Sequence, residues 1–209
     1  MTRTKDRCVA KRSTFCRVGR PICLVFVLLF LHACGVAPIS EPDFRLDLGQ
    51  LKPMMFDVEV VDIVESYRSP LNDPYVEHLA PLSPAQAIRD WAVKRFRPIG
   101  KEGSLRITIV DASITGVSLD TNEDFKALFI SEQGAELTGN FSINIEVLDS
   151  QQLLLGHVAA YATASTTLPE DASLRDRDYA MFGIVKSLVD ALDLEVSAQA
   201  DKYLQLFIH

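Results

Sequence analysis

The fold is decided by the stretch Phe141-Ser142-Ile143-Asn144-Ile145-Glu146-Val147, in which apolar and polar side chains alternate without interruption. A period of two places one set of side chains on a buried sheet face and the other set toward solvent. A turn at Asp149-Ser150 follows, and residues 153–166 alternate again. Small side chains lie on one face of this second segment: Ala160, Ala162 and Ala164. We therefore expect an antiparallel hairpin over residues 141–166.

Two further strands are predicted upstream of the hairpin. Residues 56–60 alternate in the same way, and Val61 with Ile63 continue on the other phase, which indicates one strand with a β-bulge. Residues 105–109 also alternate, and this strand can extend to Ile114. Between the hairpin and this strand the pattern is mixed, so a short strand and a helical turn both stay open there.

A first helix is predicted over residues 84–99. Ser83-Pro84-Ala85-Gln86 has the form of a capping box with proline at the first helical position, and Gly100 closes the segment. The apolar residues form one stripe that we expect to pack on a sheet: Ile88, Trp91, Ala92, Phe96 and Ile99. Trp91 is accordingly interpreted as a core residue.

A second helix is predicted near the end of the chain, with Ser173 as its cap and a break near Asp193. Its apolar face is formed by Met181, Val185, Leu188 and Leu192, with Tyr203, Leu204 and Phe207 beyond them. The element order is then strand, helix, strand, strand, strand, helix. This order favours an α+β fold, a mostly antiparallel sheet with helices packed on one face.

Charge and cysteine content differ between the two ends of the chain. Seven of 21 basic residues and one of 28 acidic residues precede Pro21, which leaves 14 basic and 27 acidic residues in the rest. This excess of acidic residues argues against binding nucleic acid, which requires a basic face. The one basic cluster is interpreted as the solvated face of the first helix: Arg89, Lys94, Arg95 and Arg97. All four cysteines lie within residues 1–34, so the body has no disulfide framework.

The N-terminal segment has the organisation of an export signal. A basic stretch ends at Arg20, and an apolar run over residues 21–31 is followed by small residues. As a helix this run spans roughly 16 Å, about half of a hydrocarbon core, so it is a poor transmembrane anchor. We expect residues 1–33 to be a signal peptide that is cleaved between Ala33 and Cys34.

Leu31-His32-Ala33-Cys34-Gly35 resembles the lipobox of bacterial lipoproteins, although His32 stands where a small residue is usual. The resemblance implies that Cys34 carries a diacylglyceryl group, commonly with palmitate chains, and anchors the chain in a membrane. Gly35 in place of aspartate resembles the sorting signal for the outer membrane of a Gram-negative host. Residues 34–54 are then expected to be a lipidated N-terminus and extended tether, and residues 55–209 a single α+β domain facing the periplasm.

The lipobox, the order of strands and helices, and Trp91 in the first helix together resemble small auxiliary lipoproteins of ABC-type envelope transport. The resemblance implies a non-enzymatic component that binds an envelope protein, with a phospholipid as a further ligand. The expected contacts are the long terminal helix and the proline-rich loop over residues 66–83, the loop through Tyr75 and Val76. A lipoprotein that supports the assembly of an outer-membrane, pilus or secretion machine is the alternative.

The sequence holds no phosphate-binding glycine loop, His-Glu-x-x-His, Gly-x-Ser-x-Gly or Cys-x-x-Cys motif. Three histidines of the body lack a ligand-spaced partner: His78, His157 and His209. Three carboxylates are candidates for a catalytic pair: Glu65, Asp111 and Asp120. Both sets are interpreted as surface or turn groups. We therefore expect no enzymatic activity, no metal and no cofactor.

Overall fold

The computed structural model describes residues 43–119 and 133–209 and forms the hairpin expected from the alternating residues. Its two strands are β5 (Gln133–Leu148) and β6 (Leu154–Pro169), which pair antiparallel with Phe141 opposite Ala162. Val158 and Ala160 of β6 are buried and Tyr161 is exposed, as the alternation requires. The prediction of this hairpin is confirmed, and the strands are longer than the sequence pattern alone indicated.

The hairpin belongs to a four-stranded sheet with the strand order β2-β4-β5-β6. Strand β2 (Val60–Glu65) pairs parallel with β4 (Ser104–Ser118), and the remaining pairs are antiparallel. A second, two-stranded sheet pairs β1 (Met54–Phe56) parallel with β3 (Phe96–Pro98). The helical elements are α2 (Pro84–Arg95), α3 (Leu174–Tyr203), and the 3-10 turns η2 (Glu77–Leu79) and η4 (Gln205–Phe207).

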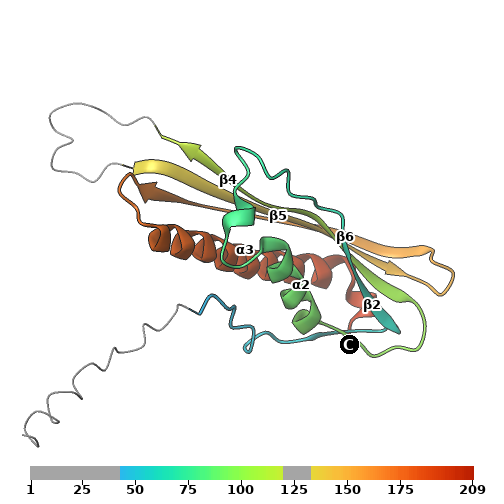
Figure 1. The fold of residues 1–209 in the computed structure, drawn as a ribbon. Coiled ribbons are helices and arrows are strands. Elements are labelled where there is room, and N and C mark those ends of the chain that lie inside the picture. The colour runs from blue at the N-terminus through green and yellow to red at the C-terminus, as the bar shows by residue number, and fades with distance from the viewer. Residues whose placement is uncertain (1–42, 120–132) are drawn as a thin grey trace, which may run out of the picture. The chain divides into compact units, whose positions relative to one another are not determined.

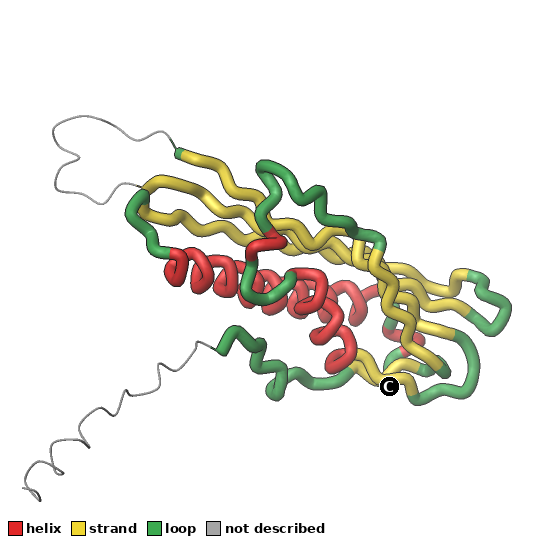
Figure 2. The backbone as a smooth tube through the Cα atoms, viewed as in Figure 1, coloured by secondary structure: helices red, strands yellow, loops and turns green. Residues whose placement is uncertain are grey.

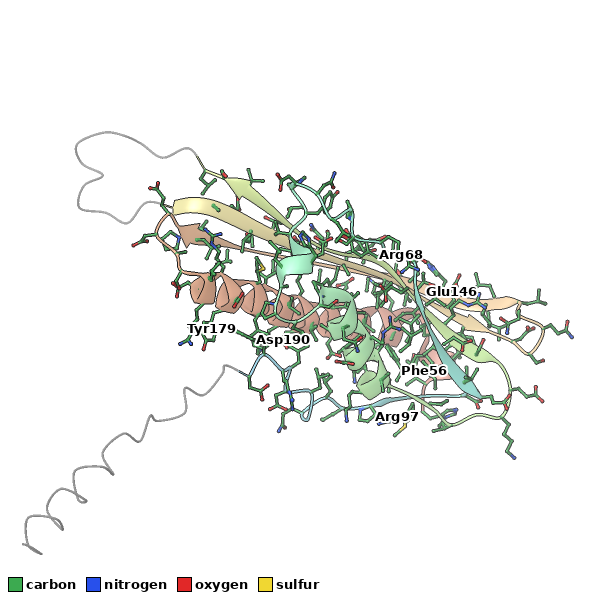
Figure 3. All side chains as sticks on the ribbon, in the orientation of Figure 1. Phe56, Arg68, Arg97, Glu146, Tyr179 and Asp190 are labelled. Carbon is green, nitrogen blue, oxygen red and sulfur yellow. The ribbon has the colours of Figure 1, made fainter. Side chains whose placement is uncertain are left out.

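Helices α2 and α3 lie on the same face of the four-stranded sheet (Figures 1 and 2), so the α+β fold with helices on one face is confirmed. The apolar stripe of α3 is buried against this face: Met181, Ile184, Val185, Leu188, Val189, Leu192 and Val196. Tyr179 and Asp190 point away from the sheet (Figure 3). Close approach depends on Gly139 of β5, where an added Cβ would lie 2.5 Å from Ile184.

The first helix begins as predicted and ends earlier than predicted. Ser83 Oγ accepts the amide hydrogen of Gln86 at 3.5 Å, and Pro84 is the first helical residue. The helix ends at Arg95, whereas the sequence pattern continued it through residues 96–99. That part of the prediction is wrong because Pro98 disfavours helical backbone at the preceding residue, and because Phe96–Pro98 forms a strand on β1.

The strand predicted across residues 56–63 is divided in the structure. The chain bends over residues 57–59, and its two parts join different sheets as β1 and β2. The bend is held by the amide of Gly100, which donates to the carbonyl of Val58 at 2.9 Å. The β-bulge lies instead in β4, where the register with β5 shifts between Ile109 and Asp111.

Helix α3 is continuous through Asp193, so the predicted break is wrong. Asp193 faces α2 at this point: its Oδ1 lies 2.9 Å from Trp91 Nε1 and 2.8 Å from Arg95 Nε. Trp91 is fully buried, which confirms its interpretation as a core residue. Asp193 thus bonds two side chains of α2 from within an uninterrupted helix.

The segment before β1 differs from the expected extended tether over residues 43–53. It has no regular secondary structure, but Leu46, Leu48 and Leu51 are packed against the core. Phe44 also contacts Tyr179 of α3, with the ring centroids 5.4 Å apart. The signal peptide, its cleavage site and residues 34–42 lie outside the described residues, as do residues 120–132.

Candidate functional site

An apolar cleft lies at the end of the sheet where α3 begins. Its volume is about 520 Å³, within the range of small-molecule sites. The walls are formed by side chains from η2, the ends of β4 and β6, the start of β5 and the first turns of α3: Val76, Leu79, Val117, Ala135, Leu137, Leu168, Leu174 and Met181. Ser118 and Gly134 of the rim flank residues 120–132.

Three ionisable side chains line the cleft: Glu170, Arg177 and Asp178. Arg177 is the one base among them, and it is exposed. The described lining therefore combines apolar contact area with two carboxylates and one guanidinium, an arrangement that fits a ligand with a large apolar portion. Among the described residues of the lining, Ser118 carries the one hydroxyl, and none is a cysteine or a histidine.

The position of α3 at the cleft is set by a capping box. Ser173 Oγ accepts the amide hydrogen of Asp176 at 3.2 Å, and Asp176 Oδ2 accepts the amide hydrogen of Ser173 at 3.0 Å. The hydrogen bonds from Ser173 lower the pKa of Asp176 below its ordinary value. The reciprocal cap fixes the first turn of the helix, which carries Leu174 and Arg177 into the cleft wall.

The proline-rich loop over residues 66–83 forms the opposite wall because it is bonded to the second half of β4. The amide of Val76 donates to the carbonyl of Ile114 at 2.7 Å, and the amide of Gly116 donates to the carbonyl of Pro74 at 2.8 Å. Tyr75 also forms a β-bridge with Thr115. Strand β2 ends before this part of β4, so the loop takes the place of a neighbouring strand.

The buried carboxylate of Glu77 holds the same loop against β4 by hydrogen bonds. Its side chain is 5% exposed and accepts the phenolic hydrogen of Tyr67 at 2.6 Å and the amide hydrogen of Ile114 at 3.3 Å. The hydroxyl of Ser69 lies close by, although its geometry falls short of a regular hydrogen bond. Glu77 also lines a smaller cavity of about 240 Å³.

Burial alone raises the pKa of Glu77, but the neighbouring hydroxyls of Ser69 and Tyr67 and the amide of Ile114 outweigh it, so the pKa is lowered. Burial and the hydrogen bond to Glu77 raise the pKa of Tyr67. Glu77 is therefore an ionised group that holds the loop in place. This role of Glu77 is not predicted from the sequence, because the residues around it do not distinguish a buried carboxylate from a solvated one.

The structure places the two residues predicted to bind a partner at the cleft or beside it. Val76 lines the cleft and packs against the core, whereas Tyr75 is half-buried next to it. Ala33 and Cys34, the predicted cleavage and lipidation site, lie outside the described residues.

The predicted carboxylate candidates have separate partners. Glu65 forms an ion pair with Arg89, and Asp111 accepts the amide hydrogen of Ser113 at 3.0 Å. Asp120 lies outside the described residues. Within the part of the chain that the structure describes, no three His, Cys, Asp or Glu side chains gather as metal ligands. Three exposed histidines belong to separate segments: His78, His157 and His209.

The basic cluster is not wholly a solvated face, which corrects that interpretation for Arg95. Arg95 is 8% exposed, and its guanidinium forms an ion pair with Asp193, though not an aligned hydrogen bond through Nε. It also donates to Ser197 Oγ at 2.6 Å and to the carbonyl of Lys52. Lys94 and Arg97 are exposed as expected.

No helix within residues 43–119 and 133–209 combines the length and the apolar character needed to cross a membrane. No protein-family model matches the chain, and no curated protein matches it.

The solved structures that are similar over part of the chain include three bacterial lipoproteins. A minor lipoprotein from Acinetobacter baumannii is 8% identical with a TM-score of 0.37, over 69% of this chain and 94% of that one. A protein described as a lipoprotein from Caulobacter crescentus is 11% identical with a TM-score of 0.35, over 68% and 90%. Rare lipoprotein B from Shewanella oneidensis is 10% identical with a TM-score of 0.38, over 69% and 96%. At these TM-scores the likenesses carry no argument about this chain.

Proposed function

We propose that this chain is a lipid-anchored, non-enzymatic protein of the bacterial envelope, and that it assists a membrane transport system by holding an apolar group in the cleft. The observation that carries the binding role is the cleft itself, about 520 Å³ in volume and lined mainly by apolar side chains. Such a lining recognises acyl chains or apolar side chains and offers few groups for covalent chemistry.

The anchor is proposed from the sequence around Cys34. An apolar run of secretory length precedes Leu31-His32-Ala33-Cys34-Gly35, which resembles a lipobox. Two acyl chains on Cys34 would hold the chain firmly, because each buried methylene contributes about 0.8 kcal/mol. Gly35 after the cysteine supports placement at the outer membrane, with the domain in the periplasm.

The proposed binding role is tested by photocrosslinking in the native membrane. A photoreactive benzoylphenylalanine replaces Leu174, which lines the cleft and is largely exposed. The same residue replaces Leu194 in a matched control, since Leu194 is also an exposed leucine of α3 and lies outside the cleft lining. We expect a lipid or transporter adduct from position 174 and none from position 194.

A cleft-filling variant makes the test specific. Ala135→Phe places a ring in the cleft, whereas Ala159→Phe adds the same ring to the other face of the sheet, between the buried residues Val158 and Ala160. The adduct from position 174 should be lost with the first variant and kept with the second. Equal adducts from positions 174 and 194, or an adduct indifferent to Ala135→Phe, would contradict the proposal.

The identity of the adduct decides between the two classes of envelope role. A phospholipid or a transporter subunit supports the auxiliary function. A pilus, secretin or other assembly component captured from the same position would replace it with the structural role that the sequence left open.

A further inference from the structure

Strand β6 forms an open edge of the four-stranded sheet. It is the last strand in the order β2-β4-β5-β6, so β5 is its one neighbour in this sheet. The register between the two strands is continuous from Gly156 to Leu168, without a bulge like the one in β4. Within residues 43–119 and 133–209, no main-chain group outside β5 hydrogen-bonds to this part of β6. Every second residue of β6 therefore directs its amide and carbonyl to an edge that these described residues leave open.

The residues that face the open edge follow from one side-chain contact. The carbonyl of Gly139 accepts the hydroxyl hydrogen of Thr163 at 3.2 Å, so this carbonyl points toward β6. Gly139 pairs with Ala164, whose amide and carbonyl accordingly point back toward β5. Since the direction alternates from residue to residue, the amides and carbonyls of Tyr161, Thr163 and Ser165 point out of the sheet edge.

This edge lacks the features by which natural proteins prevent strand addition. Protected edge strands are short, or they carry lysines, prolines, bulges or inward-pointing charges. Strand β6 has 16 residues, none of them Asp, Glu, Lys or Arg, and its one proline is the last residue, Pro169. An edge of this kind accepts a further strand through main-chain hydrogen bonds, the mode of recognition called β-augmentation.

Helix α3 limits the kind of strand that fits the edge. It packs mainly on β6, on the helical face of the sheet (Figure 1). Antiparallel pairing of two β6 edges would place two α3 helices on one face, below strands only about 4.8 Å apart. Packed helices need about 8–10 Å between their axes. A second copy of the chain therefore fits poorly, whereas an extended segment with no helix below it fits.

The space below an added segment is bordered by short side chains of α3. Ala180 and Ser187 are seven residues apart, so they lie on the same side of the helix. Asp193, which accepts a hydrogen bond from Trp91 of α2, lies on another side. Because α2 packs on β2 and β4, the side of α3 that is turned away from α2 borders the open edge. Apolar side chains of an added strand would have room there.

We propose that β6 binds an extended, uncharged segment of another protein by strand addition along residues 161–167, with apolar residues at every second position facing α3. An uncharged segment fits because β6 has no acidic or basic side chain other than His157 to pair with a charge. The proposal goes beyond the cleft, whose lining includes Leu168 and Pro169 but none of residues 161–167.

The test is a fluorescence-anisotropy titration of the full chain, solubilised in detergent, with a labelled peptide of about eight alternating threonines and valines that is capped at both ends. Ser165→Pro removes one outward amide, and an edge strand tolerates proline where the amide faces solvent. Ser165→Ala keeps the amide and is the matched control, since the Ser165 side chain is exposed.

Two methylated peptides test the same edge on the native chain, whether or not Ser165→Pro folds. When the valines face α3, the threonine amides face β6, because directly paired residues of two strands share a face. N-methylation of the threonines should therefore abolish binding, and N-methylation of the valines should preserve it.

We expect saturable binding that Ser165→Pro weakens by about tenfold or more and that Ser165→Ala leaves unchanged. No saturable binding by the native chain, equal binding by a folded Ser165→Pro variant, or equal binding of the two methylated peptides would overturn the proposal. A native chain that is dimeric in sedimentation velocity, and monomeric as Ser165→Pro, would overturn it in favour of a second copy at this edge.

Discussion

Glu77→Gln should destabilise the domain by about 2 kcal/mol, because the variant weakens two hydrogen bonds to a buried carboxylate. The partners are the phenol of Tyr67 at 2.6 Å and the amide of Ile114 at 3.3 Å, and the Glu77 side chain is 5% exposed. Hydrogen bonds to charged groups contribute about 1.5–3 kcal/mol, and an amide can accept through one oxygen only. For a body of this size the melting temperature should fall by roughly 4–8 °C.

The pH dependence of this effect follows from the direction of the pKa shift. The pKa of Glu77 is lowered in the folded protein from an ordinary value of 4.5. Its stabilisation is therefore fully present above about pH 4.5 and is lost as the pH falls through the folded pKa. Glutamine does not titrate, so the difference in unfolding free energy between the two proteins should be constant near neutral pH and shrink in acid.

The assay is urea unfolding of the native chain, Glu77→Gln and the exposed control Glu102→Gln at neutral and acidic pH. The control should change the unfolding free energy by less than about 0.5 kcal/mol. Amide hydrogen exchange at Val76 should accelerate in Glu77→Gln, because the loop loses its fastening to β4. The reasoning is refuted if Glu77→Gln unfolds like the control, or if its deficit is the same at both pH values.

Three further substitutions test the packing between the helices and the sheet. Asp193→Asn should lower the free energy of unfolding by about 3 kcal/mol, measured by thermal unfolding, because it leaves the buried guanidinium of Arg95 without its counter-charge. A decrease below about 1 kcal/mol would contradict the ion pair. Gly139→Ala should lower the free energy of unfolding by about 1–3 kcal/mol in calorimetry, since its Cβ would lie 2.5 Å from Ile184. An unchanged free energy of unfolding would contradict close packing of α3 on β5. Gly183→Ala, with open space around its Cβ, should instead stabilise the helix by about 0.5–1 kcal/mol, and a loss in the same scan would count against its exposed position.

The parts of the fold that depend on local pattern could be predicted from the sequence. Alternation located β5 and β6, and the capping signal at Ser173 located the start of α3. Both signals act over a few neighbouring residues, so they are present in the chain before any tertiary contact forms. The sheet face covered by the helices followed from the same alternation.

The errors arose where a tertiary contact overrides the local pattern. Phe96 has helical spacing from Ala92, but the chain from Phe96 onward pairs with β1, a strand about forty residues earlier. The sequence predicts a break near Asp193, whereas the structure keeps Asp193 within α3 and pairs it with Trp91. Neither partner can be identified from periodicity, which reports burial and not the identity of the contact.

The cleft could not be predicted for a related reason. Its walls come from η2, β4, β5, β6 and α3, whose residues extend from Val76 to Met181. Of this set, the sequence indicates only Val76 as a binding residue, because it lies in a proline-rich loop. The burial of the adjacent Glu77 is not predicted, since the sequence does not distinguish a glutamate that accepts hydrogen bonds in the interior from one in solvent.

The proposed place of this protein in the envelope requires acylation of Cys34, which can be measured by mass spectrometry of the N-terminal peptide of the mature chain extracted from membranes. We predict that the peptide begins at Cys34 and carries the mass of a diacylglyceryl group, and that Cys34→Ser yields no acylated peptide. A mature chain that begins at another residue, or that begins at an unmodified Cys34, would contradict the anchor and with it the proposed place of this protein in the envelope.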